Sequence, residues 1–130
     1  MGVRLSSGFK MDDSALGGRS ILVVEDEPFA ALYVETELRD AGARVYGAHQ
    51  IRDALLMAEH PALSAAVIAQ RLGNNDTAAV CRRLAHLGIP FMFHTRHDAT
   101  EVRQKWPDAP VVLKPASSKE LVGTVAGMLA

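Results

Sequence analysis

The stretch Ile21-Leu22-Val23-Val24-Glu25-Asp26-Glu27-Pro28 decides how the rest of the chain is interpreted. Its first four residues form a continuous aliphatic run, which is typical of a β-strand buried on both faces of a parallel sheet. Three carboxylates follow directly. Pro28 then stands where the first turn of a helix has no use for a backbone N–H. The stretch therefore predicts a buried strand, an acidic strand end and the start of a helix.

The alternation of apolar strand and amphipathic helix continues to the end of the chain. Further strands are expected at residues 43–48, 65–68, 90–93 and 111–113. Apolar residues at helical spacing predict helices at residues 28–41, 51–60, 76–87, 98–106 and 117–129. Five such units favour an α/β fold in which helices cover both faces of an open, doubly wound parallel sheet.

The composition excludes several classes of protein. A chain of 130 residues is one ordinary domain, and 48% hydrophobic with 22% charged residues indicates a globular core. Because 14 basic residues are balanced by 15 acidic ones, no broad cationic surface is expected, and nucleic acid is not an expected partner. No apolar run approaches the roughly 20 residues of a membrane helix, so no membrane partner is expected. The single cysteine, Cys81, cannot form an internal disulfide, which fits a cytoplasmic location.

The chain divides into a leader and one domain. Residues 1–19 combine glycine, serine and charged residues, and they lack the apolar middle segment of a secretory signal. We interpret residues 1–19 as a flexible leader and residues 20–130 as the folded domain.

Polar side chains follow three of the expected strands. Glu25 and Asp26 come after the first strand, Thr95 after the fourth, and Lys114-Pro115 after the fifth. The carboxyl ends of parallel strands share one edge of the sheet, where binding sites form. Two adjacent carboxylates repel each other unless a cation is near, and either Lys114 or Mg²⁺ can supply it. A hydroxyl and an ammonium group are suitable partners for phosphoryl oxygens.

In combination, these motifs resemble the receiver domain of two-component response regulators. The resemblance extends from about Ser20 to the C-terminus, and it implies a flavodoxin-like parallel sheet with strand order 2-1-3-4-5. It implies metal ligation, weak here, by Glu25, Asp26 and the backbone carbonyl of Arg71, with Mg²⁺ as the ion. It also implies phosphate and switch positions, namely Thr95 for the switch hydroxyl, Lys114 for the phosphate contact and Pro115 for a bond that is usually cis.

The sequence departs from this family where the chemistry takes place. The aspartate that accepts the phosphoryl group is replaced by Ala69, whose methyl group cannot attack phosphorus. One carboxylate is thereby lost from the metal site, and a carboxylate–cation contact is worth about 4 kcal/mol at an effective dielectric of ~20, before desolvation. Gln70 stands at a usually aliphatic position, and Val111 replaces an aromatic residue that reports switching in many members.

The leading hypothesis is a stand-alone receiver domain in phosphorelay signal transduction that binds protein partners without being phosphorylated and is not an enzyme. A histidine kinase or another regulator is the expected partner, through residues 98–106, 111–113 and 117–129. The same surface is the expected site of a homodimer. Two alternatives stay open, namely a phosphorelay member with weak phosphate or Mg²⁺ binding or an unorthodox acceptor, and a small metal-dependent hydrolase.

Structural roles also stay open for the individual residues. Lys114 can serve as an ion-pair partner of Asp26, and Thr95 can hydrogen-bond within its own loop. His94, His97 and Asp98 lie close in sequence near the expected site, which makes a transition-metal site conceivable.

Overall fold

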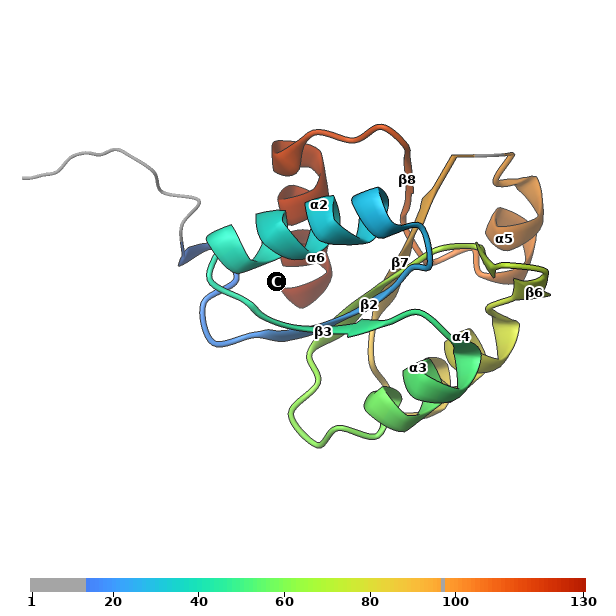
Figure 1. The fold of residues 1–130 in the computed structure, drawn as a ribbon. Helices are drawn as coiled ribbons and strands as arrows, with labels where there is room; N and C mark the ends of the chain where they lie inside the picture. Colours follow the sequence, from blue (N-terminus) through green and yellow to red (C-terminus); the bar gives the residue numbers. More distant parts are fainter. Residues whose placement is uncertain (1–13, 97) are drawn as a thin grey trace, which may run out of the picture.

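A five-stranded parallel sheet forms the centre of the protein (Figure 1). The computed structural model describes residues 14–96 and 98–130. The strand order is β3-β2-β4-β7-β8, which confirms the predicted order 2-1-3-4-5. The strands are β2 (Ser20–Val24), β3 (Arg44–Ala48), β4 (Ala65–Ile68), β7 (Phe91–Thr95) and β8 (Val111–Leu113).

Helices cover both faces of this sheet (Figure 1). One face carries α2 (Pro28–Asp40) and α6 (Ser118–Leu129), whereas the other carries α3 (Ile51–Ala58), α4 (Ala78–His86) and α5 (Thr100–Lys105). Because side chains alternate along a strand, Ile21 and Val23 enter the core under α2 and α6. Leu22 and Val24 enter the core on the opposite face. Both faces of β2 are thus buried, as its aliphatic run predicted.

Helix starts follow from local hydrogen bonds. Glu27 caps α2, because its carboxylate accepts hydrogen bonds from the backbone N–H groups of Ala30 at 2.6 Å and Phe29 at 3.3 Å. Ser117 caps α6 in the same way by accepting from the Glu120 N–H at 3.0 Å. Among the described residues, no helix is both long and apolar enough to cross a membrane.

Several elements differ from the sequence prediction. The expected loop after β4 contains a small antiparallel hairpin, β5 (Arg71–Leu72) and β6 (Asn75–Asp76), whose turn uses Gly73 at a φ of +60°. Leu87, the last residue of the helix expected at residues 76–87, lies beyond the end of α4 and is exposed. Leu16 packs into the core four residues before β2, within the segment interpreted as leader, and residues 1–13 lie outside the described part of the chain.

Leu22 provides a test of the packing. Replacing the fully buried Leu22 by Ala leaves a cavity, and we expect a loss of about 2–5 kcal/mol in the free energy of unfolding, measured by urea denaturation. Leu56→Ala is the matched control, because this leucine is 68% exposed; its effect should stay within about 0.5 kcal/mol. Equal losses in the two variants would contradict the assigned burial.

Candidate functional site

The carboxyl ends of the strands surround one polar cavity of about 520 Å³. Its walls come from the β2 end, the segment after β4, the β7 end and the residue after β8. It is lined by Glu25, Asp26, Glu27, Ala69, Gln70, Arg71, Gly73, His94, Thr95, Arg96 and Lys114. The structure therefore brings together the four polar residues singled out at the strand ends. Pro115 follows Lys114 through a cis peptide bond.

The strand register determines which side chains are neighbours in the cavity. Val24 pairs with Ile68, and Ile68 pairs with Phe93. Continuing this register by one residue places Glu25, Ala69 and His94 in a row across three strands. Alternation along β2 and β7 directs Glu25 and His94 to the face covered by α2 and α6, whereas Ala69, just beyond β4, packs with the core of the opposite face.

A buried ion pair reaches across this row. The Lys114 Nζ lies 2.7 Å from the Glu25 Oε1, and the two side chains are only 14% and 6% exposed. Their strands, β8 and β2, are separated in the sheet by β7 and β4. The other carboxylate oxygen of Glu25 accepts a hydrogen bond from the Glu27 N–H at 3.1 Å. The alternative interpretation that paired Lys114 with Asp26 is therefore wrong in its partner, which is Glu25.

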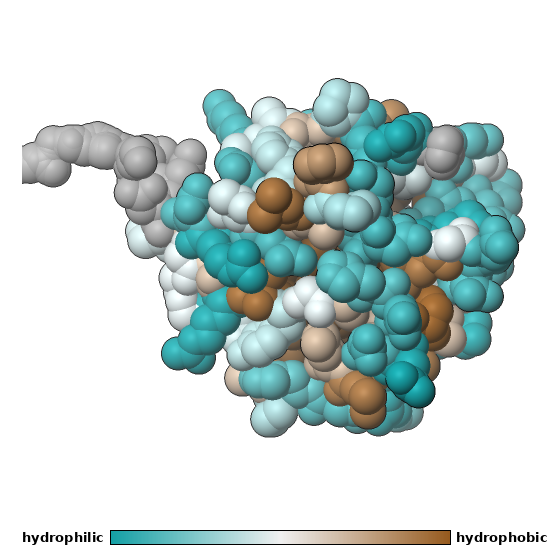
Figure 2. All heavy atoms as spheres, viewed as in Figure 1, coloured by the Kyte–Doolittle hydropathy of each residue, from teal (hydrophilic) through white to brown (hydrophobic). Residues whose placement is uncertain are grey.

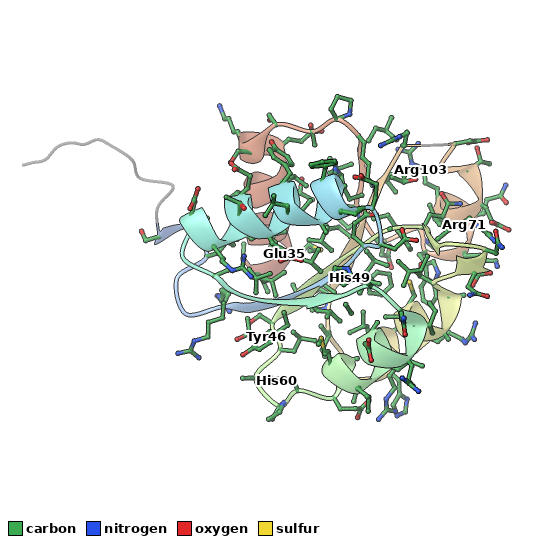
Figure 3. All side chains as sticks on the ribbon, viewed as in Figure 1. Glu35, Tyr46, His49, His60, Arg71 and Arg103 are labelled. Atoms are coloured by element: carbon green, nitrogen blue, oxygen red, sulfur yellow. The ribbon has the colours of Figure 1, made fainter. Side chains whose placement is uncertain are left out.

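Asp26 instead holds the β5–β6 hairpin. Its Oδ2 accepts a hydrogen bond from the Gly73 N–H at 2.7 Å. Arg71 belongs to the same hairpin and lies toward the outside of the molecule at the right of Figure 3. Its guanidinium donates to the backbone carbonyl of Asn74. The hairpin thus closes one side of the cavity through backbone and carboxylate contacts.

The carboxylates do not form a preformed Mg²⁺ site. Receiver domains typically bind this ion at the corresponding place, and the resemblance assigns Glu25, Asp26 and the Arg71 carbonyl to it. Here one Glu25 oxygen is engaged by Lys114 and one Asp26 oxygen by Gly73. Over residues 14–96 and 98–130, no three or more histidine, cysteine, aspartate or glutamate side chains are grouped so that they could hold a metal.

Hydroxyl groups order the segment after β4. Thr95 donates to the Gln70 Oε1 over a long 3.4 Å, so it interacts across the cavity and not only within its own loop. Thr77 is buried, and its hydroxyl lies 2.8 Å from the carbonyl oxygen of Ala69 and 3.1 Å from that of Gln70. The sequence analysis missed Thr77, because nothing in its local pattern distinguishes it from a loop residue.

His94 is the unusual polar residue of the cavity. It is 3% exposed, and neither ring nitrogen has a hydrogen-bond partner among the described residues. Burial, and then the positive charge of Lys114, lower the pKa of His94 to about 4, so the imidazole is neutral at pH 7. His97, its proposed companion in a metal site, lies outside the described residues.

Other residues have structural roles. His49, near the centre of Figure 3, places its Nδ1 2.8 Å from the Glu25 carbonyl oxygen and was also missed from sequence. Cys81 packs in the core, and burial raises its pKa to about 12, which makes the thiol unreactive at neutral pH. Trp106 packs edge-on against Phe91 at a ring-centroid distance of 5.4 Å.

Known structures share this architecture. A response regulator receiver protein from Sinorhizobium medicae aligns with a TM-score of 0.79 and 27% identity, over 85% of this chain and 94% of that chain. The non-phosphorylated HemR receiver domain from Leptospira biflexa aligns with a TM-score of 0.73 and 21% identity, over 86% and 94% of the two chains. The response regulator PhyR from Brucella abortus aligns at 0.76 and 20%, over 90% of this chain but 50% of that one. No family model and no curated protein matches the sequence.

The strand order and the cavity at the carboxyl ends of the strands match the architecture of receiver domains. The chain has the fold of response-regulator receiver domains, as its strand order and its solved structural neighbours show. Those neighbours support a role in response-regulator signalling.

The buried ion pair gives the first prediction for the site. Lys114→Met leaves the Glu25 carboxylate buried without its cation, so we expect a loss of about 3–5 kcal/mol in unfolding free energy. The double variant Glu25→Gln/Lys114→Met removes both charges and should recover most of that loss. Urea denaturation measures both, with Lys105→Met as the control at an exposed lysine. A Lys114→Met effect no larger than that of Lys105→Met would contradict the pairing.

His94 gives a pH prediction. The imidazole is neutral in the folded protein down to about pH 4, whereas the unfolded chain takes up a proton below the ordinary value of 6.5. The resulting contribution to stability is complete above pH 6.5 and is lost as the pH falls toward 4. Between pH 7 and pH 5, the native chain should lose about 2 kcal/mol more unfolding free energy than His94→Val. The exposed His86→Ala variant should behave like the native chain.

Proposed function

We propose that this chain acts in two-component signalling as a protein-interaction module that works without phosphorylation and without enzymatic activity. The observation that carries this proposal is the position of Ala69 in the cavity. It follows β4 directly, is 7% exposed and stands in the row between Glu25 and His94. Phosphoryl transfer to a receiver requires a carboxylate nucleophile at this place, and a methyl group has no lone pair to offer.

The other carboxylates of the cavity are not substitutes for the missing acceptor. Glu25 is paired with Lys114, Asp26 accepts from Gly73, and Glu27 caps α2. Each already serves a structural contact that a covalent phosphoryl group would disrupt. His94 is a poor nucleophile here, because both of its ring nitrogens are buried. These contacts argue against an unorthodox acceptor. Any binding of Mg²⁺ through Asp26, Glu25 and the Arg71 carbonyl is proposed to be weak.

The switching contacts are also made without phosphate. Lys114 obtains its carboxylate partner from Glu25, and Thr95 is directed toward the Gln70 amide oxygen. In many receiver domains, an aromatic residue at the position of Val111 changes rotamer when the switch hydroxyl moves. Val111 has no aromatic ring and cannot report a movement of Thr95 in this way. We infer that the domain has a single signalling conformation. Its signalling is then controlled by the availability of a partner and not by phosphorylation.

Two exposed surfaces are suited to partners such as a histidine kinase or another regulator. The surface formed by α5, β8 and α6 exposes Arg103 and Lys119, and Leu113 is 51% exposed on it. We propose this surface for partners and for a homodimer. A second surface lies on α2, where Phe29 is 81% and Leu32 is 61% exposed, and apolar side chains interrupt the hydrophilic surface there (Figure 2).

Neither nucleic acid nor a membrane is a proposed partner, and the cytoplasm is the proposed location.

Intact-protein mass spectrometry tests the central proposal. After incubation with acetyl phosphate and Mg²⁺, we expect no gain of a phosphoryl group, because Ala69 offers no nucleophile. A receiver domain that acetyl phosphate is known to label serves as the positive control. The proposal fails if the native chain gains one phosphoryl group under the same conditions, and peptide mapping would then identify the acceptor.

A further inference from the structure

The strand ends around the cavity are joined to one another by a series of contacts. The Ala69 N–H donates to the Val24 carbonyl oxygen at 2.8 Å and so connects the end of β4 to β2. The Lys114–Glu25 ion pair connects β8 to β2. The Lys114 N–H also donates to the Thr95 carbonyl oxygen at 2.8 Å, which connects β8 to β7. Three sides of the cavity are thereby held, and the fourth side lies between the ends of β4 and β7.

A contact between two side chains closes this fourth side. Gln70 and Thr95 each lie two residues beyond a paired residue of their strands, Ile68 of β4 and Phe93 of β7, and the Thr95 hydroxyl donates to the Gln70 Oε1 at 3.4 Å. Both residues are held in place. The Gln70 carbonyl oxygen accepts from the Thr77 hydroxyl at 3.1 Å and from the Thr77 N–H at 3.2 Å, and Thr95 is 4% exposed within β7. The contact between these two anchored residues therefore depends on the amide of Gln70.

A glutamine suits this position for two reasons. Its amide oxygen is an acceptor, whereas an aliphatic side chain offers none to a hydroxyl. The amide is also uncharged, and the carboxylates of Glu25, Asp26 and Glu27 already line the cavity, so a further carboxylate would add repulsion. Threonine has three staggered rotamers, and an acceptor on one side favours the rotamer that directs the hydroxyl toward it. The acceptor that orients Thr95 is therefore supplied by Gln70 of the chain itself.

We propose that Gln70 is a positioning residue that fixes the Thr95 hydroxyl and, through the pairing of Thr95 with β8, the β8 edge of the partner surface. Thr95 pairs with Leu113, which is 51% exposed on the surface formed by α5, β8 and α6, and it accepts the Lys114 N–H. A change at Thr95 is therefore transmitted directly to β8. This inference rests on the proposed function, since it explains how that surface keeps one conformation without phosphorylation. Gln70 acts through Thr95 and lies in the cavity, not on the surface.

Nuclear magnetic resonance on the full chain tests the proposal at the Thr95 side chain. Three-bond couplings to the γ-methyl carbon of Thr95 report whether the side chain has one rotamer or an average of several. Gln70→Leu removes the acceptor, and Gln70→Asn keeps the amide on a side chain one methylene shorter. Gln70→Glu keeps an acceptor oxygen at the same distance along the side chain, although the added charge lowers stability. The matched control is Gln104→Leu, which makes the same change at an exposed glutamine of α5.

We expect averaged couplings in Gln70→Leu and Gln70→Asn, and the couplings of a single rotamer in the native chain, Gln70→Glu and Gln104→Leu. Hydrogen exchange of the Lys114 amide, which donates to Thr95, should be about two- to tenfold faster in Gln70→Leu and Gln70→Asn, as expected for the loss of one hydrogen bond. In a Thr95→Val background, adding Gln70→Leu should change this exchange no further. Circular dichroism melts establish that each variant is folded.

The proposal is overturned if either the Thr95 couplings or the Lys114 exchange stay native in Gln70→Leu and Gln70→Asn. It is overturned equally if Gln70→Glu behaves like Gln70→Leu, because the packing of the side chain and not its acceptor oxygen then orients Thr95. If Gln70→Leu does not fold, Gln70→Asn decides. Labelling of the native chain by acetyl phosphate would instead refute the proposed function and would not alter these couplings, so the two failures are distinguishable.

Discussion

The buried ion pair between Lys114 and Glu25 is the interaction on which the arrangement of the cavity depends. Its two residues follow strands that are not neighbours, so the pair connects β8 with β2 across the intervening strand ends. A buried charge without a partner lowers the stability of the fold. The ends of β2 and β8 are therefore held at the separation that keeps the two charges paired. Everything that projects into the cavity from β4 and β7 has to fit between these two strands.

The other contacts of the cavity complete this closed arrangement. Asp26 holds the β5–β6 hairpin through Gly73, and Thr77 holds the segment after β4 through two backbone carbonyls. Polar groups that phosphoryl chemistry would require to be available are therefore engaged in maintaining the fold.

The cavity and the exposed surfaces are separate parts of the domain. The strand order and the overall fold have the architecture of a receiver domain, as the solved structures of receiver domains show. The exposed faces of α2, α5 and α6 lie outside the cavity. In the proposed function, binding to a partner uses these faces, whereas phosphorylation would use the cavity. Few residues are shared between the faces and the cavity, so a domain without the second capacity can keep the first.

Much of the fold follows from local patterns in the sequence. The aliphatic runs predict the bounds of β2, β4 and β8 closely. A buried strand is a continuous apolar run, so its ends are marked by the first polar residues on either side. The convergence of Glu25, Thr95 and Lys114 follows from parallel strands sharing one edge. The partner of Lys114 does not, because adjacent residues of a strand point to opposite faces, and only the register shows that Glu25, and not Asp26, shares a face with the lysine. The sequence also could not predict that the His94 ring lacks a hydrogen-bond partner. Whether a partner is present depends on which side chains of neighbouring strands surround the ring, and no single segment contains that information.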